Sequence, residues 1–551
     1  MMMRIVARYR IFKKICHKNP TRHKSTSITP FFEYGKLYGP RVALCDQHTQ
    51  QTYENIFKMA MRLSRIIDRR LPWMDKENIG FLCQSNSQYL IMLWAIWMSG
   101  HTAVPLNPQH PDKLLHYFAS NSKSRLLMTV PEYAPTMVKI AAQCGASLYV
   151  AEGSQYDDVD DLDDEYNKLR SRFGEDNNCL ILYTSGTTGN PKGVVLTYKN
   201  LWASMQVISD MWKFSSSDVV LNILPLNHIY GIAYALLTPL YIGAATVMLP
   251  NFSSATIWQY FLGRKKEKIT VFMGTPAIYA KLVDKYEKTY TKYKDKVRDY
   301  VKSHVRLMVS GSAPLPVSLH RKWYHITGHK ILVRYGMTEI GMAMTNEYTC
   351  FREADYVGIP PVGMGVCLVN PIKNDTVCLK CTNQDWKLVF DNDTKTDVQG
   401  ELWVKGDSVF KEYFNDPKGT EKKKTIDGWF KTGDFFEYSV HKKKFRFVGR
   451  LDVDIIKSSC YKTNTLQIES RLLAHPKVEE VTVMSVKDEK FGERIAAMLV
   501  PKPGANVSLG ELRDWCSECV PKDSLPYILK IVKKLPRSAL EKKSNEVVKE
   551  D

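Results

Sequence analysis

The sequence predicts an α/β protein with two domains: a large N-terminal layered domain, in which helices flank the sheets, and a small C-terminal α+β domain. Two observations support this prediction. From residue 79 onward, apolar runs of strand length alternate with helical patterns, which is typical of largely parallel sheets. Near residue 450 the pattern changes to a compact segment of about a hundred residues, long enough for a separate domain.

In the large domain, apolar runs and helical periodicity predict the strands 79–83, 125–130 and 147–151 and the helix 88–98. The uncharged stretch 229–250 is long enough for a transmembrane helix. However, Pro239 and Gly243 divide it, so we expect a buried short helix followed by a strand.

In the small domain, the patterns predict helices at 466–474 and from Leu509, and strands around 481–486 and 494–500. The change of pattern follows Gly449 and Arg450. We therefore assign residues 28–449 to the large domain and residues 450–551 to the small one.

The composition is that of a globular protein, with 44% hydrophobic and 25% charged residues among 551. The net charge is +19, but eight positive charges precede Pro30 and no acidic residue accompanies them. The other basic runs are scattered, and the Lys- and Tyr-rich segment 284–303 is typical of an exposed helix. We therefore expect no nucleic acid among the partners.

Residues 1–27 are typical of a mitochondrial transit peptide. Ile5, Tyr9, Phe12 and Cys16 share one helical face, and Arg and Lys residues surround them. The arginines interrupt any apolar block that a secretory signal would need. We expect import into the mitochondrial matrix, with a basic tail on a cytosolic protein as the alternative.

The twelve cysteines are widely spaced, which favours a reducing compartment over a disulfide-stapled secreted domain. Two pairs, Cys378 with Cys381 and Cys516 with Cys519, have the spacing of zinc ligands. No histidine pair accompanies either of them, so ordinary thiols are the better interpretation.

An apolar strand leads into a loop that contains three glycines, four hydroxyls and a lysine, and a helical pattern begins near Thr197. The loop consists of Thr184, Ser185, Gly186, Thr187, Thr188, Gly189, Asn190, Pro191, Lys192 and Gly193. Glycines allow backbone N–H groups to approach a phosphate, and the hydroxyls and the lysine add donors. The loop is therefore a candidate polyphosphate site, although its spacing is not that of a Walker A loop. A flexible surface turn is the alternative.

This loop resembles the phosphate loop of the adenylate-forming superfamily, which includes the acyl-CoA synthetases. Six further motifs follow in the order of that family: 225–231, 311–314, 335–339, 400–404, 428–434 and 449–450. The segments 41–48, 334–342 and 453–457 resemble the malonate-activating CoA ligases of mitochondria. The resemblance covers residues 30–545.

The resemblance implies that ATP and a small dicarboxylic acid form an acyl-adenylate and pyrophosphate, and that the acyl group then passes to coenzyme A. Malonate is the expected acid, with methylmalonate or another short or medium-chain acid as alternatives. Mg²⁺ is the expected metal, since nucleotide phosphates and one or two carboxylates suit it. The small domain is expected to move, with Asp452 at the position of the hinge.

The same resemblance implies roles for single residues. The loop Thr184–Gly193 would hold the phosphates, and Glu339 and Thr184 would hold Mg²⁺. Tyr335, followed by Gly336, Met337 and Thr338, would lie against the adenine. Asp434 would accept hydrogen bonds from the ribose, and Arg450 would reach the ribose and phosphate. His228 would shape the carboxylate pocket beside the adenylate. The separation of Asp434 and Arg450 suggests a lengthened hairpin around Lys442–Lys444.

The second carboxylate of malonate requires a cation, because burying it without a partner costs roughly several kcal/mol. Arg334 is the best candidate, since its planar fork can bind a carboxylate through two hydrogen bonds. Ser310 and Ser312 could add donors, and Arg321 is a weaker candidate. The alternative for Arg334 is an ion pair at the surface.

Near the C-terminus, Lys542 stands where the family has its catalytic lysine. Glu541 replaces the glycine that precedes this lysine in the family. Ser458, Ser459 and Cys460 replace a glycine pair beside the route of CoA. These departures leave open a second hypothesis, a nucleotide-binding homologue that is impaired in thioester formation.

Overall fold

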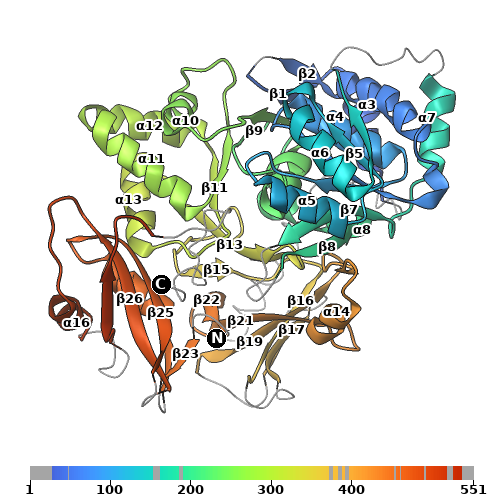
Figure 1. Ribbon diagram of the computed structural model, residues 1–551. Helices are drawn as coiled ribbons and strands as arrows, with labels where there is room; N and C mark the ends of the chain where they lie inside the picture. The colour runs from blue at the N-terminus through green and yellow to red at the C-terminus, as the bar shows by residue number, and fades with distance from the viewer. Residues whose placement is uncertain are drawn as a thin grey trace, which may run out of the picture.

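The computed structural model describes residues 28–535, apart from residue 48 and the segments 153–161, 185–189, 372–376, 383–386, 391–395, 452–454, 459–460, 489–491 and 518–524. It contains two large sheets flanked by helices, a third large sheet below them, and a small C-terminal domain (Figure 1). The predicted α/β fold with a large and a small domain is confirmed.

The first sheet has the strand order β14-β13-β12-β11-β9-β10-β1-β2. Its strands are β14 (Gly341–Thr345), β13 (Leu332–Met337), β12 (Leu307–Ser310), β11 (Val271–Gly274), β9 (Val219–Asn222), β10 (Ala245–Met248), β1 (Val42–Cys45) and β2 (Gln50–Thr52). All pairs from β13 to β1 are parallel. Ligands of such sheets bind beyond the carboxyl ends of the strands, so those ends locate the candidate site.

The second sheet has the order β20-β8-β7-β4-β3-β5-β6. Its strands are β20 (Glu412–Tyr413), β8 (Lys192–Thr197), β7 (Asn178–Thr184), β4 (Thr102–Pro105), β3 (Asn78–Leu82), β5 (Leu126–Thr129) and β6 (Ser147–Val150). The strands predicted at 79–83, 125–130 and 147–151 are therefore confirmed. The helix predicted at 88–98 is α4 (Ser87–Met98), which is buried on every side from Tyr89 to Met98 because it lies in the core that the sheets share.

The third sheet was not predicted. All of its pairs are antiparallel, whereas the alternation of strand and helix patterns indicates largely parallel sheets. In order, its strands are β15 (Tyr356–Gly358), β22 (Lys444–Arg450), β21 (Phe430–Ser439), β19 (Val398–Gly406), β16 (Met364–Val369), β17 (Val377–Thr382) and β18 (Lys387–Phe390). The β21–β22 hairpin, closed by the pair Ser439–Lys444, confirms the hairpin expected around Lys442–Lys444. It also places Asp434 directly opposite Arg450.

Four helices form one corner of the large domain (Figure 1). They are α10 (Ser254–Phe261), α11 (Pro276–Thr289), α12 (Lys294–His304) and α13 (Val317–Thr327). The single exposed helix expected at 284–303 is wrong, since the segment divides into the end of α11, a 3-10 turn (Thr291–Tyr293) and α12.

The uncharged stretch 229–250 is buried, as predicted. It forms a π-helical turn, η4 (Tyr230–Leu237), then α9 (Thr238–Tyr241) and strand β10. In the part of the chain that the structure describes, no helix has both the length and the apolar character needed to span a membrane.

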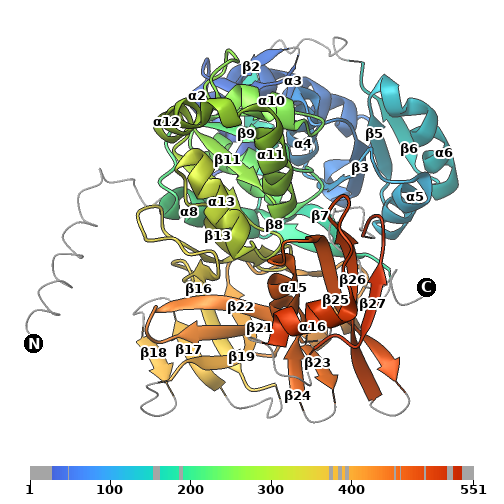
Figure 2. The ribbon, with the colours of Figure 1, turned by 90° about the vertical axis from the view of Figure 1, so that its left-hand side faces the viewer.

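The small domain has its own hydrophobic core, built around residues such as Leu472, Val483 and Leu499. It contains β23 (Ile455–Ser458), β24 (Tyr461–Asn464), α15 (Thr465–Leu473), β25 (Val478–Asp488), β26 (Gly492–Pro501), α16 (Leu509–Ser517) and β27 (Ile528–Ile531). Both helices and both longer strands agree with the predicted ones, whereas β23, β24 and β27 were not predicted. The domain lies beside the third sheet, where α15 contacts β22 (Figure 2).

Candidate active site

The predicted phosphate loop connects two paired strands. β7 ends at Thr184, β8 begins at Lys192, and these two residues are register partners. The helix expected near Thr197 is α8 (Tyr198–Met211), which Thr197 caps through its hydroxyl. The predicted start of this helix is confirmed, and strand β8, which was not predicted, separates it from the loop. The loop therefore connects two antiparallel strands, and the N-terminus of α8 is not part of it.

Lys192, at the end of this loop, contacts Asp416 and Tyr413, which lie far along the chain. Its Nζ lies 2.8 Å from Asp416 Oδ2 and 4.9 Å from the centroid of the Tyr413 ring. The Tyr413 hydroxyl donates a hydrogen bond of 2.9 Å to Glu339 Oε1. Tyr413 thus links the lysine of the loop to the acidic residue that the sequence assigns to the metal.

Glu339 occupies the turn between β13 and β14 and is only 6% exposed. Burial raises the pKa of its carboxyl group, while the Tyr413 hydrogen bond and the charge of Arg450 act in the opposite direction. Glu339 is therefore a buried acid that a cation would help to keep ionised. Among the described residues, no group of three or more His, Cys, Asp or Glu side chains is arranged as a metal site.

Tyr335, Asp434 and Arg450 form the second cluster of predicted site residues. The Tyr335 hydroxyl donates to Asp434 Oδ2 at 2.6 Å, and Arg450 Nε lies 2.8 Å from Asp434 Oδ1. Burial and the charge of Asp434 raise the pKa of Tyr335, so this phenol stays protonated and donates. The charge of Asp434 raises the pKa of Arg450. The nucleotide-binding residues predicted on β13, β21 and β22 are thus in contact.

Arg334 is buried in β13, with 4% exposure, and does not form the surface ion pair considered as its alternative. Its guanidinium carbon lies 3.8 Å from the Tyr230 ring centroid and 5.5 Å from that of Tyr234, both on η4. Among the described residues, Nε and Nη2 of Arg334 have no hydrogen-bond partner. A buried cation with open donors is a ready receptor for an anion.

Glycine at position 311 makes room for this side chain, because an added Cβ would lie 2.2 Å from Arg334 Nε. Ser310, the last residue of β12, is 1% exposed, and its hydroxyl has no hydrogen-bond partner among the described residues. Ser312 is exposed with a φ of 71°, and Arg321 is exposed on α13. The structure thus favours Arg334 and Ser310 over Ser312 and Arg321.

His228 lies in the loop between β9 and η4 and is half-buried. Two contacts fix this loop: Tyr89 donates to the Leu226 carbonyl at 2.8 Å, and Asn107 donates to Asn227 Oδ1 at 3.3 Å. His228 therefore stands two residues before Tyr230, which contacts Arg334. Both lie beyond the carboxyl ends of the parallel strands.

Several predicted residues lie outside the described part of the chain: Ser185, Gly186, Thr187, Thr188, Gly189, Asp452, Ser459, Cys460, Glu541 and Lys542. The same is true of Cys519 and of the side chains of Cys378 and Cys381. Sequence reasoning missed the contributions of Tyr413, Asp416 and Tyr234, because nothing local marks a tyrosine as the partner of a distant glutamate or arginine. Tyr230 was recognised only as a member of the motif 225–231, without a role of its own.

Comparison with known families agrees with this arrangement. Residues 31–414 match the AMP-binding enzyme family, and residues 467–542 match the C-terminal domain of the AMP-binding enzymes. The chain therefore belongs to the AMP-binding enzymes, the class that its fold and nucleotide cluster define. The two matches fall on either side of the predicted domain boundary at 449/450, which itself stays a prediction.

Within this family, the chain belongs to the malonate–CoA ligases. It is 38% identical to the mitochondrial malonate–CoA ligase ACSF3 of Bos taurus, over 96% of this chain and 90% of the relative. It is 35% identical to the Homo sapiens enzyme of the same name, over 96% and 95%. The ATP-bound crystal structure of MatB from Rhodopseudomonas palustris superposes with a TM-score of 0.79 at 25% identity, covering 94% of this chain and 98% of that one.

Proposed function

We propose that this chain joins malonate to coenzyme A in two steps that consume ATP. First, a carboxylate oxygen of malonate attacks the α-phosphorus of ATP, and malonyl-adenylate forms with release of pyrophosphate. The thiolate of CoA then attacks the acyl carbon, the thioester forms, and AMP leaves with the electrons of the broken bond. Family membership and the names of the relatives support the reaction class. The buried guanidinium of Arg334, with its unpaired donors, is the observation that supports malonate as the acid.

In this proposal, Arg334 binds the carboxylate of malonate that does not react. The rings of Tyr230 and Tyr234 lie against the guanidinium and help to exclude water, while Nε and Nη2 remain available for two parallel hydrogen bonds. Ser310 adds a hydroxyl donor. A fatty acid would leave the cation unpaired and buried, which costs several kcal/mol, so we expect this pocket to reject it. Methylmalonate keeps both carboxylates and is the alternative substrate.

For the nucleotide, we propose that Asp434 accepts hydrogen bonds from the ribose hydroxyls while Arg450 keeps its carboxylate ionised and oriented. Tyr335, with Gly336, Met337 and Thr338 after it, would contact the adenine. The loop Thr184–Gly193 would hold the phosphates, with Lys192 as its cation. Positive charge and oriented N–H groups are what a pentavalent phosphorus transition state requires.

Mg²⁺ fits the residues present. Glu339 offers one buried carboxylate whose pKa burial raises, and Thr184 offers a hydroxyl at the start of the loop. One carboxylate, a hydroxyl and phosphate oxygens form the hard oxygen set that Mg²⁺ prefers. Bound there with ATP, it would neutralise charge on the phosphates. We propose that Tyr413 orients Glu339 for this contact.

We further propose that the small domain supplies Lys542 to the reacting carboxylate and α-phosphate, with rotation at Asp452 between the two steps. His228 would shape the pocket around the carboxylate that reacts. The impaired-homologue hypothesis rests on Glu541 and on Ser458, Ser459 and Cys460, all of which lie wholly or in part outside the described residues. No contact in the structure favours it over an active enzyme.

We propose that the protein works in mitochondria and, more specifically, in the matrix. The Bos taurus and Homo sapiens relatives are named as mitochondrial enzymes, and residues 1–27 have the composition of a transit peptide. A fluorescent fusion of the whole chain should enter mitochondria and resist protease after the outer membrane is opened. A fusion in which the eight cations before Pro30 are replaced by glutamine should stay in the cytosol, and equal import of both would contradict the proposal.

The function is tested by incubating the purified chain with Mg·ATP, CoA and one acid at a time: malonate, methylmalonate or hexanoate. We expect the highest kcat/KM for malonate, a lower value for methylmalonate, and no thioester from hexanoate. Equal turnover of hexanoate and malonate would contradict the proposed acid. Malonate-dependent pyrophosphate release without any thioester would instead identify the impaired homologue.

A further inference from the structure

Positive charge is concentrated in the corner formed by α10 to α13. Residues 264–330 contain 16 Lys and Arg but only five Asp and Glu, a net charge of +11. Another eight positive charges precede Pro30, and the whole chain carries +19. The rest of the protein is therefore neutral, in contrast to the scattered charge expected from the basic runs.

The helices of this corner form one continuous surface. Arg298 of α12 donates to the His325 carbonyl of α13 at 3.1 Å and lies 5.4 Å from the Tyr324 ring centroid. The turn after α10 also packs on α12, since a Cβ at Gly263 would overlap the Tyr300 hydroxyl. Figure 1 shows the four helices gathered together.

Most of the cations on this surface are not neutralised by neighbours. Lys292, Lys294, Lys296 and Lys302 are exposed, and in the described part of the chain none of them forms an ion pair. Lys288 pairs with Asp284 on its own helix, α11, and Lys322 of α13 pairs with Glu287 of α11. Two further acids, Asp295 and Asp299, lie on α12. An exposed aromatic ring, Tyr293, stands between Lys292 and Lys294 with 58% exposure.

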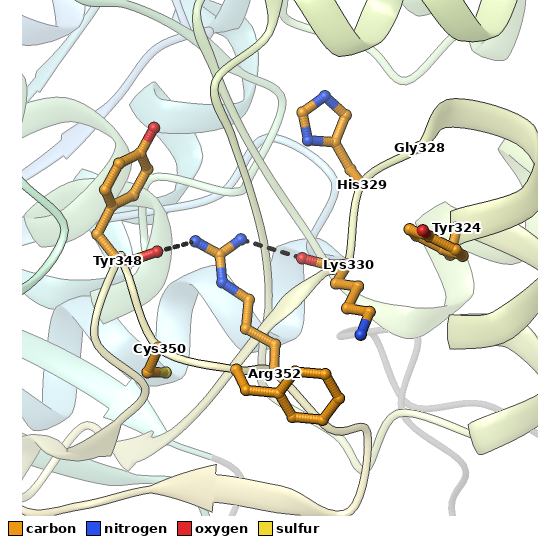
Figure 3. A pocket seen from close by; sticks show the side chains of 8 residues that line it. Tyr324, Gly328, His329, Lys330, Tyr348, Cys350 and Arg352 are labelled. Atoms are coloured by element: carbon orange, nitrogen blue, oxygen red, sulfur yellow. Dashed lines mark hydrogen bonds between the residues drawn. The ribbon is translucent and has the colours of Figure 1, made fainter.

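A cavity of about 290 Å³ adjoins this surface at the end of α13, lined by Tyr324, Lys330, Tyr348, Phe351 and Arg352 among others. Figure 3 shows Arg352 held between two backbone carbonyls, those of Lys330 at 3.0 Å and Tyr348 at 2.7 Å. Lys330 Nζ lies 3.8 Å from the Phe351 ring centroid. Among the described residues, neither cation pairs with a carboxylate. The cavity thus presents two cations and no acid.

We propose that the corner formed by α10 to α13, with this cavity, docks on an anionic phospholipid membrane, and that Lys330 and Arg352 receive a phosphate head group. Lysines with long apolar stems and exposed rings, here Tyr293 and Phe351 (66% exposed), are the side chains that settle at the head-group level. The charged surface is formed by packed helices that carry mainly lysine, rather than by a groove of arginine forks aimed at bases, which favours a membrane over nucleic acid.

The test uses the full-length chain in which the eight Lys and Arg before Pro30 are replaced by glutamine, so that these cations do not contribute. In this background, Lys292, Lys294 and Lys296 are changed to Gln. The matched control changes the exposed Lys113, Lys139 and Lys168 to Gln, with the same loss of charge elsewhere. Co-sedimentation is measured with vesicles of phosphatidylcholine alone or mixed with phosphatidylglycerol at about seven to three.

We expect the parent and the control to bind the mixed vesicles, weakly at high salt, and not the neutral ones. The triple variant at 292–296 should lose about a hundredfold in partition coefficient, since each lysine contributes about fivefold. Lys330→Gln should lose about fivefold, against none for Lys139→Gln. Equal losses in both triple variants, or no binding that depends on lipid charge, would overturn the proposal. So would binding of RNA that the triple variant abolishes while vesicle binding stays unchanged. Unfolding temperatures confirm that the variants fold.

Discussion

Arg334 combines two properties that rarely occur together, full burial and open hydrogen-bond donors. A buried cation without a counter-ion costs free energy, because neither water nor a carboxylate replaces its hydration. Cation–π contacts with the rings of Tyr230 and Tyr234 offset only part of that free energy. The side chain is therefore better matched to an anionic ligand than to the ligand-free protein.

We expect Arg334→Gln to lower kcat/KM for malonate by about 100-fold to 1,000-fold, because it removes charged hydrogen bonds worth about 3–4 kcal/mol. The affinity for Mg·ATP should change little. Arg321→Gln, on the exposed face of α13, is the matched control and should behave as the parent. Steady-state kinetics with malonate measures this effect. An unchanged kcat/KM in Arg334→Gln would show that Arg334 does not bind malonate.

The same residue gives a prediction about stability. We expect Arg334→Met to raise the free energy of unfolding by about 1–3 kcal/mol while abolishing turnover, because an apolar side chain suits this buried position better than an unpaired cation. Urea unfolding of the ligand-free protein measures this. A less stable Arg334→Met variant would mean that the guanidinium is already satisfied without substrate.

Tyr413 gives a prediction about pH. Burial raises the pKa of Glu339, and the Tyr413 hydrogen bond counteracts this shift. Tyr413→Phe should therefore raise that pKa further, because the ionised carboxylate loses one hydrogen bond. Since Glu339 must be ionised to hold a cation, the acid limb of kcat/KM should move to higher pH. Tyr293→Phe, at an exposed position, is the control, and coinciding profiles of Tyr413→Phe and the parent would refute the link.

At the scale of elements, the sequence predicted those strands and helices whose position depends on a local run of apolar residues. The strands β3 and β5 and helix α4 have the expected positions because each carries a continuous buried run. Strand β6 also lies where it was expected, although it is only half-buried. β8 was not predicted, because the local pattern after the glycine-rich loop does not by itself indicate a strand. Its pairing with β7 is what defines it. The antiparallel third sheet depends on pairings between distant segments, such as β16 with β19, which no local period specifies.

An ion pair joins three neighbouring strands of the first sheet. Asp218, just before β9, is 2% exposed and accepts hydrogen bonds from Arg306, just before β12, at 2.6 and 2.7 Å. It also accepts one from Thr270, just before β11, at 2.7 Å. Burial would raise the pKa of Asp218, but these hydrogen bonds and the charge of Arg306 outweigh it and lower the pKa.

A group whose folded pKa is lowered contributes stability above its unfolded pKa, about 4, and loses it as pH falls through the folded pKa. Asp218→Asn should therefore cost about 3 kcal/mol of unfolding free energy at pH 7, and the deficit should shrink below about pH 4. Asp295→Asn, exposed on α12, should cost almost nothing. Denaturant unfolding across pH measures both, and a deficit that grows in acid would contradict the role of the pair.

At the scale of the molecule, the chain forms two bodies with separate cores, and the proposed chemistry needs both. Lys542→Ala should abolish malonate-dependent pyrophosphate release while Mg·ATP binding, measured by calorimetry, is retained. Lys543→Ala, one residue further on, should remain active. If Lys543→Ala lost activity and Lys542→Ala kept it, the assignment of the catalytic lysine would move by one residue.

The sequence alone predicted the division into a large and a small domain and the motifs of the nucleotide site, since seven motifs in family order identify a superfamily. It also selected Arg334, because malonate requires a cation. It could not show that Arg334 is buried beside the rings of Tyr230 and Tyr234, that Tyr413 contacts Glu339, or that the charge gathers on one corner. These facts depend on which distant side chains the fold brings together.

The proposed reaction requires that malonate becomes an adenylate in this protein. Exchange of labelled pyrophosphate into ATP, measured with malonate and Mg²⁺ but without CoA, tests it most directly, because the exchange requires reversible formation of malonyl-adenylate. We expect exchange that depends on malonate, is absent with hexanoate and is lost in Arg334→Gln. A protein that binds Mg·ATP but shows no exchange when malonate is added would contradict the proposed reaction.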